Sequence, residues 1–396
     1  MDMKVKAEQY RSYLTDDVIP FWLKYGIDNE QSGFLTCVDR DGSLFSEDKS
    51  VWFQGRGTWV FSKMYNCIEK KQEYLQAAKS GYDFLKKCYD TDGRMFFTVT
   101  RDGKPIQKRR YYFSETFAAI ACAEYYAASG DDEALELSRT TFDLIEKLYR
   151  KPELSPPKYN TDNLRIKALS IPMILLSTTQ VLRTHDKERA DFYNGFITEM
   201  LDEILKSGFY NTEKKALFEF ISPNDEPLKG PKSRLVNPGH SLEAAWFISI
   251  EALRLNDDEL MNKALNIIDW SLETGWDNEY GGVYSFVDIE GKPAEQLEWD
   301  MKLWWPHTEA LYATALAWKI TNKTKYSEWF EKINEYSFTK FSDKEHGEWY
   351  GYLHRDGTVS NSLKGNIFKG PFHLPRALIL LNDLLECNDI KGYFPL

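Results

Sequence analysis

This 396-residue chain shows a pattern of paired helices, and that pattern restricts the folds it can adopt. Apolar residues recur three and four positions apart along almost its whole length, as in helices that pack on one face. We predict twelve helices, over residues 4–25, 53–70, 73–90, 114–129, 131–149, 164–184, 187–207, 239–255, 257–274, 307–321, 323–338 and 373–387. Short connections within a pair alternate with longer connections between pairs.

The two kinds of connection differ in composition. Short ones contain residues that cap helices well, and we expect Asp131 and Asn256 to be N-caps. Several long ones combine an acidic turn with alternating aromatic residues, which predicts a small β-hairpin. Hairpins are expected over residues 88–97, 275–284 and 343–351, with further hairpin turns at 39–42 and 288–291.

This organisation predicts an all-α fold, an (α/α)6 barrel with small β-hairpin elements in its long connections. Six inner helices would run parallel, and their N-termini would open together into a crater lined with free backbone N–H groups. We expect one catalytic domain over residues 1–396, because no linker rich in Pro, Gly or Ser interrupts the pattern. An α-solenoid is the main alternative, but the repeat lacks its strict period.

Composition narrows the partners. The net charge of −11 argues against nucleic acid and anionic membranes, and the short basic run at 108–110 is expected to be a solvated loop. Five cysteines without paired spacing predict neither disulfides nor a zinc site, and they favour a cytoplasmic protein. No apolar leader or membrane span is expected. Aromatic residues, 15% of the chain, suit a sugar-binding wall.

Three of the six histidines stand where inner helices are predicted to begin. They are His240, His307 and His373, and each follows a turn that contains Gly or Pro. Imidazole both accepts and donates a proton near neutral pH. Three of them at equivalent helix mouths therefore predict proton-transfer chemistry in the crater. His185, His346 and His354 lie in polar, loop-like surroundings, and we expect no catalytic role for them.

Local spacing suggests partners for these imidazoles. His240 and Glu243 are three residues apart on one helical face, so the carboxylate is expected to orient that ring. His373 and Arg376 have the same spacing, which places a guanidinium beside the second ring. Glu309 lies only two residues after His307, so a regular helix would point these two side chains in different directions.

The motifs around these residues resemble the N-acylglucosamine 2-epimerase (renin-binding protein) family over nearly the whole chain. They are Arg56, His240-Ser241-Leu242-Glu243, Trp304-Trp305-Pro306-His307-Thr308-Glu309 and Lys369-Gly370-Pro371-Phe372-His373-Leu374-Pro375-Arg376. The resemblance implies an (α/α)6 barrel that interconverts N-acetyl-D-glucosamine and N-acetyl-D-mannosamine.

The resemblance also implies roles for individual residues. His240 and His373 would form the acid/base pair, Arg56 would stabilise the oxyanion at O1, and Glu309 would orient and polarise. Substrate binding is expected from Glu243, His307, Arg376, Trp305, Trp52 and Lys369. Neither a metal nor a cofactor is required for this chemistry. Family properties suggest ATP as an allosteric activator and a homodimer as the quaternary state.

Other functions remain open at this point. A cellobiose or mannobiose 2-epimerase, or an aldose–ketose isomerase, would use the same fold and the same enediolate. An (α/α)6 glycoside hydrolase would need two carboxylates across the crater, for which Glu115, Asp162 and Glu309 are the candidates. A non-catalytic binding protein would exchange no proton at C2.

Overall fold

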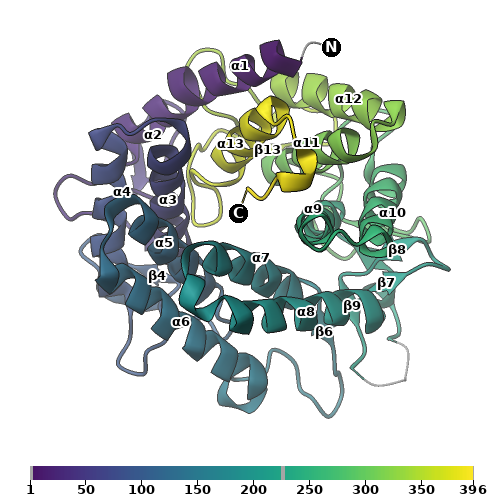
Figure 1. The fold of residues 1–396 in the computed structure, drawn as a ribbon, viewed down its shortest axis with the longest axis horizontal. Coiled ribbons are helices and arrows are strands. Elements are labelled where there is room, and N and C mark those ends of the chain that lie inside the picture. The colour runs from purple at the N-terminus through teal and green to yellow at the C-terminus, as the bar shows by residue number, and fades with distance from the viewer. Residues whose placement is uncertain (1–2, 224–227, 396) are drawn as a thin grey trace.

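The computed structural model describes residues 3–223 and 228–395, and its helices form two concentric rings (Figure 1). The inner ring contains α3 (Val51–Lys63), α5 (Phe113–Ser129), α7 (Ser170–His185), α9 (Pro238–Leu255), α11 (Trp304–Thr321) and α13 (His373–Glu386). The outer ring contains α1 (Met3–Tyr13), α2 (Ile19–Tyr25), α4 (Gln72–Leu85), α6 (Asp132–Arg150), α8 (Ala190–Lys206), α10 (Asp258–Gly275) and α12 (Thr324–Lys340). The predicted (α/α)6 architecture is confirmed.

Sequence patterns explain which helices lie inside. Outer helix α6 buries one stripe, from Ala134 through Ser138, Phe142 and Ile145, and leaves its other face in solvent. Inner helices α9 and α11 are buried almost all round, since the outer ring covers one side and other inner helices cover the other. Within residues 3–223 and 228–395, no helix is both long enough and apolar enough to cross a bilayer.

Several predicted boundaries need correction. The first predicted helix is interrupted by a π-helical segment at Leu14–Val18, and α7 begins at Ser170 instead of 164 because the preceding residues enter a strand. Asp131 caps α6 as predicted, with its side chain accepting from the Glu133 N–H. Asn256 instead ends α9 in the left-handed conformation, and the next residue, Asp257, caps α10.

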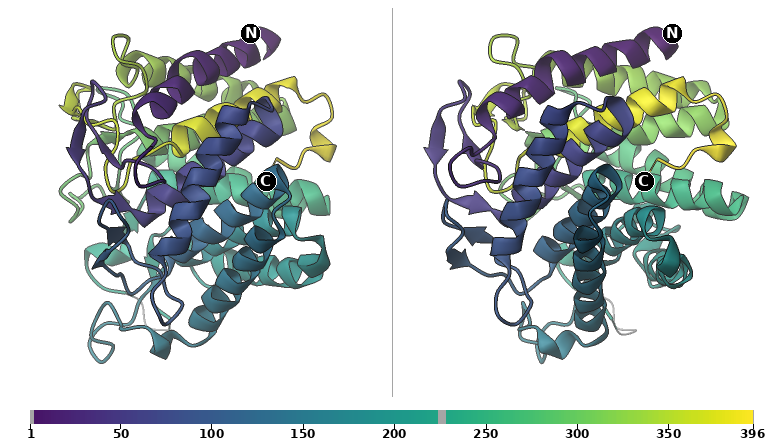
Figure 2. Two further views of the ribbon diagram at one scale, coloured as in Figure 1. Left: turned by 90° about the vertical axis from the view of Figure 1, so that its left-hand side faces the viewer. Right: turned by 60° about the vertical axis from the view of Figure 1, so that its left-hand side comes forward.

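Short antiparallel strands gather on one side of the ring, at the left in both views of Figure 2. They form six small sheets in the described residues: β1 (Cys37–Val38) with β2 (Leu44–Ser46); β3 (Lys49–Ser50) with β4 (Thr98–Val99) and β5 (Pro105–Gln107); β6 (Lys167–Ala168) with β9 (Phe220–Ile221); β7 (Tyr210–Asn211) with β8 (Ala216–Leu217); β10 (Leu235–Val236) with β11 (Val287–Asp288); and β12 (Lys302–Leu303) with β13 (Tyr352–Leu353) and β14 (Val359–Asn361).

The hairpin predictions are partly right. Residues 39–42 do form the turn between β1 and β2. The turn at 288–291 joins no hairpin, because β11 pairs with the distant β10. The three longer stretches are loops closed by single bridges, Tyr89 to Met95, Trp276 to Val283 and Ser342 to Trp349.

Buried ion-pair groups tie these loops to one another. An aspartate after each of α2, α10 and α12 binds a fully buried lysine and an arginine from a neighbouring hairpin, with nitrogen–oxygen distances of 2.7–3.0 Å. The groups are Asp28 with Lys49 and Arg101, Asp277 with Lys302 and Arg355, and Asp343 with Lys364 and Arg40.

These groups anchor the chain where it approaches the inner helices. Lys49 and Lys302 lie two residues before α3 and α11, and Lys364 lies on the segment that leads to α13. Burial alone raises the pKa of each aspartate, but the arginine and lysine partners hold each pKa well below its usual range. The carboxylates therefore stay ionised, and the starts of three inner helices are held in place.

Candidate active site

His240 lies in the first turn of α9, where one hydrogen bond holds its backbone and another holds its ring. The side chain of the N-cap, Asn237, accepts from the His240 N–H at 3.1 Å. The Nδ1 atom of His240 lies 3.0 Å from a Glu219 carboxylate oxygen, between β8 and β9. An ionised carboxylate only accepts, so Nδ1–H donates to Glu219 and Nε2 is left for chemistry. The predicted partner, Glu243, does not hold this ring.

His373 belongs to a second group of buried charges on α9, α11 and α13. Its Nδ1 lies 2.9 Å from Glu309 Oε1. Arg376 Nη2 donates to the same Glu309 oxygen at 2.7 Å and to Glu243 at 2.5 Å. Glu309 thus holds the His373 ring through Nδ1, while Arg376 neutralises both acidic side chains.

Trp305 joins the two histidines. Its ring centroid lies 5.1 Å from that of His240 and 5.8 Å from that of His373. Gly239 permits this approach, because a Cβ there would meet the Trp305 ring at 2.6 Å. Both imidazoles therefore lie against the Trp305 ring, although they come from helices α9 and α13, which are far apart in the sequence.

The surroundings shift the two imidazoles in opposite directions. Burial lowers the pKa of His240, but the carboxylates of Glu219, Glu243 and Glu309 together raise it by more, so the pKa lies above its ordinary value. The pKa of His373 lies well below its ordinary value, because burial and the charges of Arg376 and Arg56 disfavour the imidazolium. Such divergence is typical of an acid and a base that act together.

Arg56, on α3, lies near the same group of charges, since Glu243, Arg376 and Glu309 all influence its pKa. Its Nη1 donates to the Phe368 carbonyl at 2.9 Å, and its guanidinium lies 4.2 Å from the ring centroid of Phe117. Trp52, one turn earlier, stacks at 5.5 Å from the Arg56 guanidinium. Burial lowers the pKa of Arg56 to about 9, which still leaves the side chain charged at neutral pH.

Two residues predicted to bind substrate are instead held by contacts within the protein. His307 is fully buried, with Nε2 accepting from the Val283 N–H at 2.9 Å and Nδ1 donating to the Leu303 carbonyl at 2.6 Å. Burial lowers its pKa to about 3, so it stays neutral. No ring nitrogen is left for a sugar, and the structure does not support the predicted contact.

Lys369 is the second such residue. It is fully buried and donates to Glu348 at 3.1 Å and to the Lys364 carbonyl at 2.8 Å, beneath the segment that leads to His373. This contact fits a positioning role instead of substrate binding. The remaining histidines lie elsewhere, as expected: His185 ends α7 against Glu124, and His346 and His354 lie in loops after α12.

A metal ion is not favoured at this site. Glu243, Glu309 and His373 offer three ligand atoms within 4.8 Å of one another, a group found among the described residues. However, Arg376 donates to both carboxylates and lies 3.4 Å from the His373 ring nitrogen. The guanidinium thus takes the place of a cation, and the residues do not fit a metal centre.

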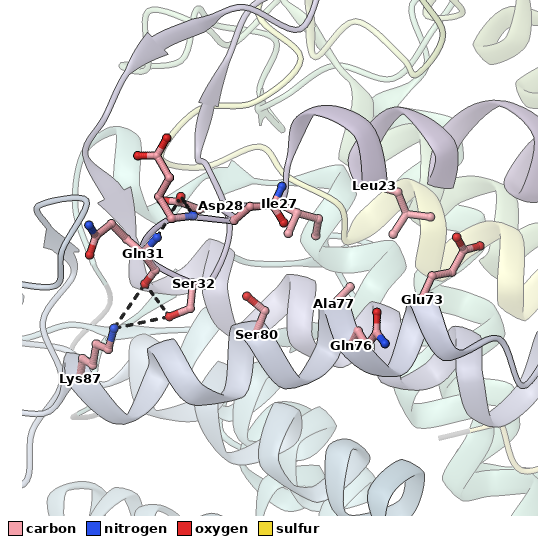
Figure 3. Close-up of a pocket in the computed structure, with 12 residues that line it drawn as sticks. Leu23, Ile27, Asp28, Gln31, Ser32, Glu73, Gln76, Ala77, Ser80 and Lys87 are labelled. Atoms are coloured by element: carbon pink, nitrogen blue, oxygen red, sulfur yellow. Dashed lines mark hydrogen bonds between the residues drawn. The ribbon is translucent and has the colours of Figure 1, made fainter.

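A separate hollow of about 630 Å³ lies between the loop after α2 and the outer helix α4 (Figure 3). Asp28, Gln31, Ser32 and Lys87 line one end, where Lys87 approaches the Gln31 carbonyl at 3.3 Å. None of the histidines borders it. It lies on the outer surface, apart from the candidate active site.

Comparison with known proteins agrees with this arrangement. Residues 33–371 match the family model described as N-acylglucosamine 2-epimerase (GlcNAc 2-epimerase). The chain belongs to this family. It is 36% identical to N-acylglucosamine 2-epimerase of Bos taurus over 94% of this chain and 89% of the relative. The human N-acylglucosamine 2-epimerase is 34% identical, over 93% and 88% of the two chains.

A solved structure supports the fold independently. Cellobiose 2-epimerase from Bacillus thermoamylovorans superposes with a TM-score of 0.84 at 23% identity, over 96% of this chain and 99% of that one. The family predicted from the histidine motifs and Arg56 is confirmed. Sequence reasoning missed Glu219, which lies in a long connection, 21 residues before its partner His240, with no local pattern to mark it.

Proposed function

We propose that the protein interconverts N-acetyl-D-glucosamine and N-acetyl-D-mannosamine by moving the proton on C2 of the open-chain sugar. The observation that carries this proposal is the pair of imidazoles on Trp305, each oriented by its own carboxylate. Membership of the family and 36% identity to a bovine N-acylglucosamine 2-epimerase support the choice of substrate.

The chemistry is a proton transfer without net oxidation. The C1 aldehyde acidifies the C2 proton, which the neutral His373 removes through Nε2. The electron pair of the C2–H bond then forms an enolate across C1 and C2, and we expect its oxyanion at O1 to lie against Arg56. His240, protonated, donates from Nε2 to the opposite face of C2. The Trp305 ring contacts both imidazoles.

The protonation states agree with this sequence of steps. The pKa of His373 is lowered and that of His240 is raised, so the resting enzyme holds a neutral base and a charged acid. After one turnover the two states are exchanged, and the reverse reaction starts from that form. No metal or redox cofactor is needed, because no electron leaves the sugar.

The contacts do not favour a glycoside hydrolase. Hydrolysis requires one protonated and one ionised carboxyl group across the crater. Glu309 and Glu243 both accept from Arg376, so one guanidinium holds both carboxyl groups and the two are not set apart as an acid and a base. Glu115 is fully buried and bound to Arg94 at 2.6 Å, and Asp162 lies exposed in the connection before α7.

The direct test is incubation with N-acetyl-D-mannosamine in D2O, with the products followed by NMR. We expect N-acetyl-D-glucosamine carrying deuterium at C2. In a parallel incubation with D-mannose, which carries a hydroxyl group on C2, a ketose with deuterium at C1 would instead identify an aldose–ketose isomerase. If N-acetyl-mannosamine stays unlabelled while cellobiose becomes labelled at C2, the substrate assignment is wrong although the mechanism stands.

The pH dependence of kcat/KM provides a second prediction. We expect a bell-shaped profile, with an acid limb below pH 6.5 where His373 becomes protonated and an alkaline limb above pH 6.5 where His240 loses its proton. The kcat/KM profiles for the two epimers should have the same shape. The ratio of the two kcat/KM values equals the equilibrium constant between two neutral sugars, and that constant does not change with pH.

Glu219→Gln separates the two limbs. It removes the charge that raises the pKa of His240, so the alkaline limb should move to lower pH while the acid limb stays in place. Glu213→Gln, an exposed change in the same connection, is the matched control and should alter neither limb. An unchanged alkaline limb in Glu219→Gln would assign that limb to another group.

A further inference from the structure

Guanidinium groups and aromatic rings alternate from the histidines outward. The Arg376 guanidinium lies 4.7 Å from the centroid of Phe372, and that of Arg56 lies 5.3 Å from the same ring. Trp52 follows, 5.5 Å from Arg56 and 5.9 Å from Arg109, the residue shortly before α5. From the sequence, the basic run at 108–110 is expected to be a solvated loop. That prediction is wrong for Arg109, which packs among aromatic rings.

The three arginines differ in how their charge is balanced. Arg376 binds two carboxylates. Neither Arg56 nor Arg109 forms an ion pair with a carboxylate in the described part of the chain. Arg56 donates to the Phe368 carbonyl and Arg109 donates to the Tyr111 hydroxyl, and the buried Nε of each has no acceptor. Two arginines without a direct carboxylate partner therefore lie beside Trp52, since Glu243 and Glu309, the carboxylates that act on Arg56, are already bound by Arg376.

Such an arrangement suits an anion. Partly buried cations are costly unless a negative group balances them. The Arg109 guanidinium lies over the Phe97 ring, 3.7 Å from its centroid, and the N–H groups of a guanidinium all lie in one plane. A planar guanidinium fixed by stacking binds the oxygens of a phosphate group through paired, charge-assisted hydrogen bonds.

We propose that Arg56 and Arg109 bind a phosphate-class oxyanion beside Trp52, at the outer edge of the active site. The oxyanion is a separate ligand and no substituent of the sugar. The assignment of the oxyanion as a separate ligand rests on the proposed function, in which Arg56 contacts O1 at the reacting end of the sugar. Because that end carries a free aldehyde, the space beyond Arg56 lies past the end of the sugar.

Titration with inorganic phosphate tests the site. We expect saturable binding, measured by calorimetry and by quenching of tryptophan fluorescence, at constant ionic strength. Arg109→Gln should weaken binding by about tenfold or more, since it removes a charge-assisted contact. Arg110→Gln is the matched control, because it removes the same charge from an exposed neighbour, and it should bind as the parent does.

Two results would overturn the site: no saturable phosphate binding by the parent protein, or equal weakening in Arg109→Gln and Arg110→Gln. Competition between N-acetylglucosamine 6-phosphate and inorganic phosphate for the Arg109-dependent site would overturn its assignment to a separate ligand. Simultaneous binding of inorganic phosphate and N-acetylglucosamine supports it. Phosphate binding is read without turnover, so it can hold even if the protein epimerises another sugar.

Discussion

Replacing His373 with asparagine is expected to abolish interconversion of the two epimers. Loss of a general acid or base typically lowers the rate by about a hundred- to ten-thousandfold. Here the loss should reach the upper end, because the remaining imidazole, His240, is held in place by Glu219 and by the Trp305 ring. It cannot reach both faces of one carbon.

The measurement is kcat in each direction together with the C2 proton signal in D2O. His354→Asn provides the control, since that histidine is exposed in the loop after β13 and should leave both readouts unchanged. Circular dichroism checks that the helices persist. Turnover by His373→Asn within about tenfold of the parent would remove His373 from the mechanism, because general acid–base catalysis contributes more than that.

The second large effect is expected from Arg376→Met. This change leaves Glu243 and Glu309 as neighbouring buried carboxylates without the cation that binds both. Removing one partner of a buried ion pair costs about 3–5 kcal/mol of unfolding free energy. Activity should fall as well, since Glu309 would no longer be fixed beside His373.

Chemical denaturation measures the change in unfolding free energy. In the Arg376→Met background, Glu243→Gln should recover part of the lost stability, because one unpaired charge is removed while its shape is kept. Glu243→Gln in the parent should instead destabilise, since it weakens the contact with Arg376. Additive losses in the double variant would show that the two residues are not coupled in this way.

Much of the fold was predictable from the sequence, because its strongest signal is helical periodicity. Inner and outer helices alternate along the chain, and that alternation places His240 and His373 at one end of the ring. The small strands were harder to predict. Their pairing, such as β3 with β4 and β10 with β11, joins segments about 50 residues apart and depends on the ring itself.

The site was predicted less completely, and His307 shows why. A helix turns by about 100° per residue. Trp305 and Glu309 are four residues apart and therefore share the face that points toward His373. His307 lies between them, so it points to the opposite side, where it stacks on Tyr336 of α12. A residue's position in the sequence predicts which end of the helix it occupies, but it does not predict the direction in which its side chain points.

Glu219 shows the other limit. It lies in the connection between β8 and β9, and only the folded ring brings it 3.0 Å from His240. Glu243 had the expected helical spacing but is drawn to Arg376 instead, because a guanidinium binds two carboxylates more strongly than an imidazole does. Spacing identified groups that share a face, and the charges in the crater decided which of them pair.

The central claim is that imidazoles from α9 and α13 meet one sugar carbon from opposite sides. A crystal structure with N-acetylmannosaminitol, a linear analogue that cannot react, would test it most directly. We expect C2 to lie between the Nε2 atoms of His240 and His373, each at about 3–3.5 Å and on opposite faces. Both Nε2 atoms on the same face of C2, or either ring out of reach of the ligand, would contradict the account.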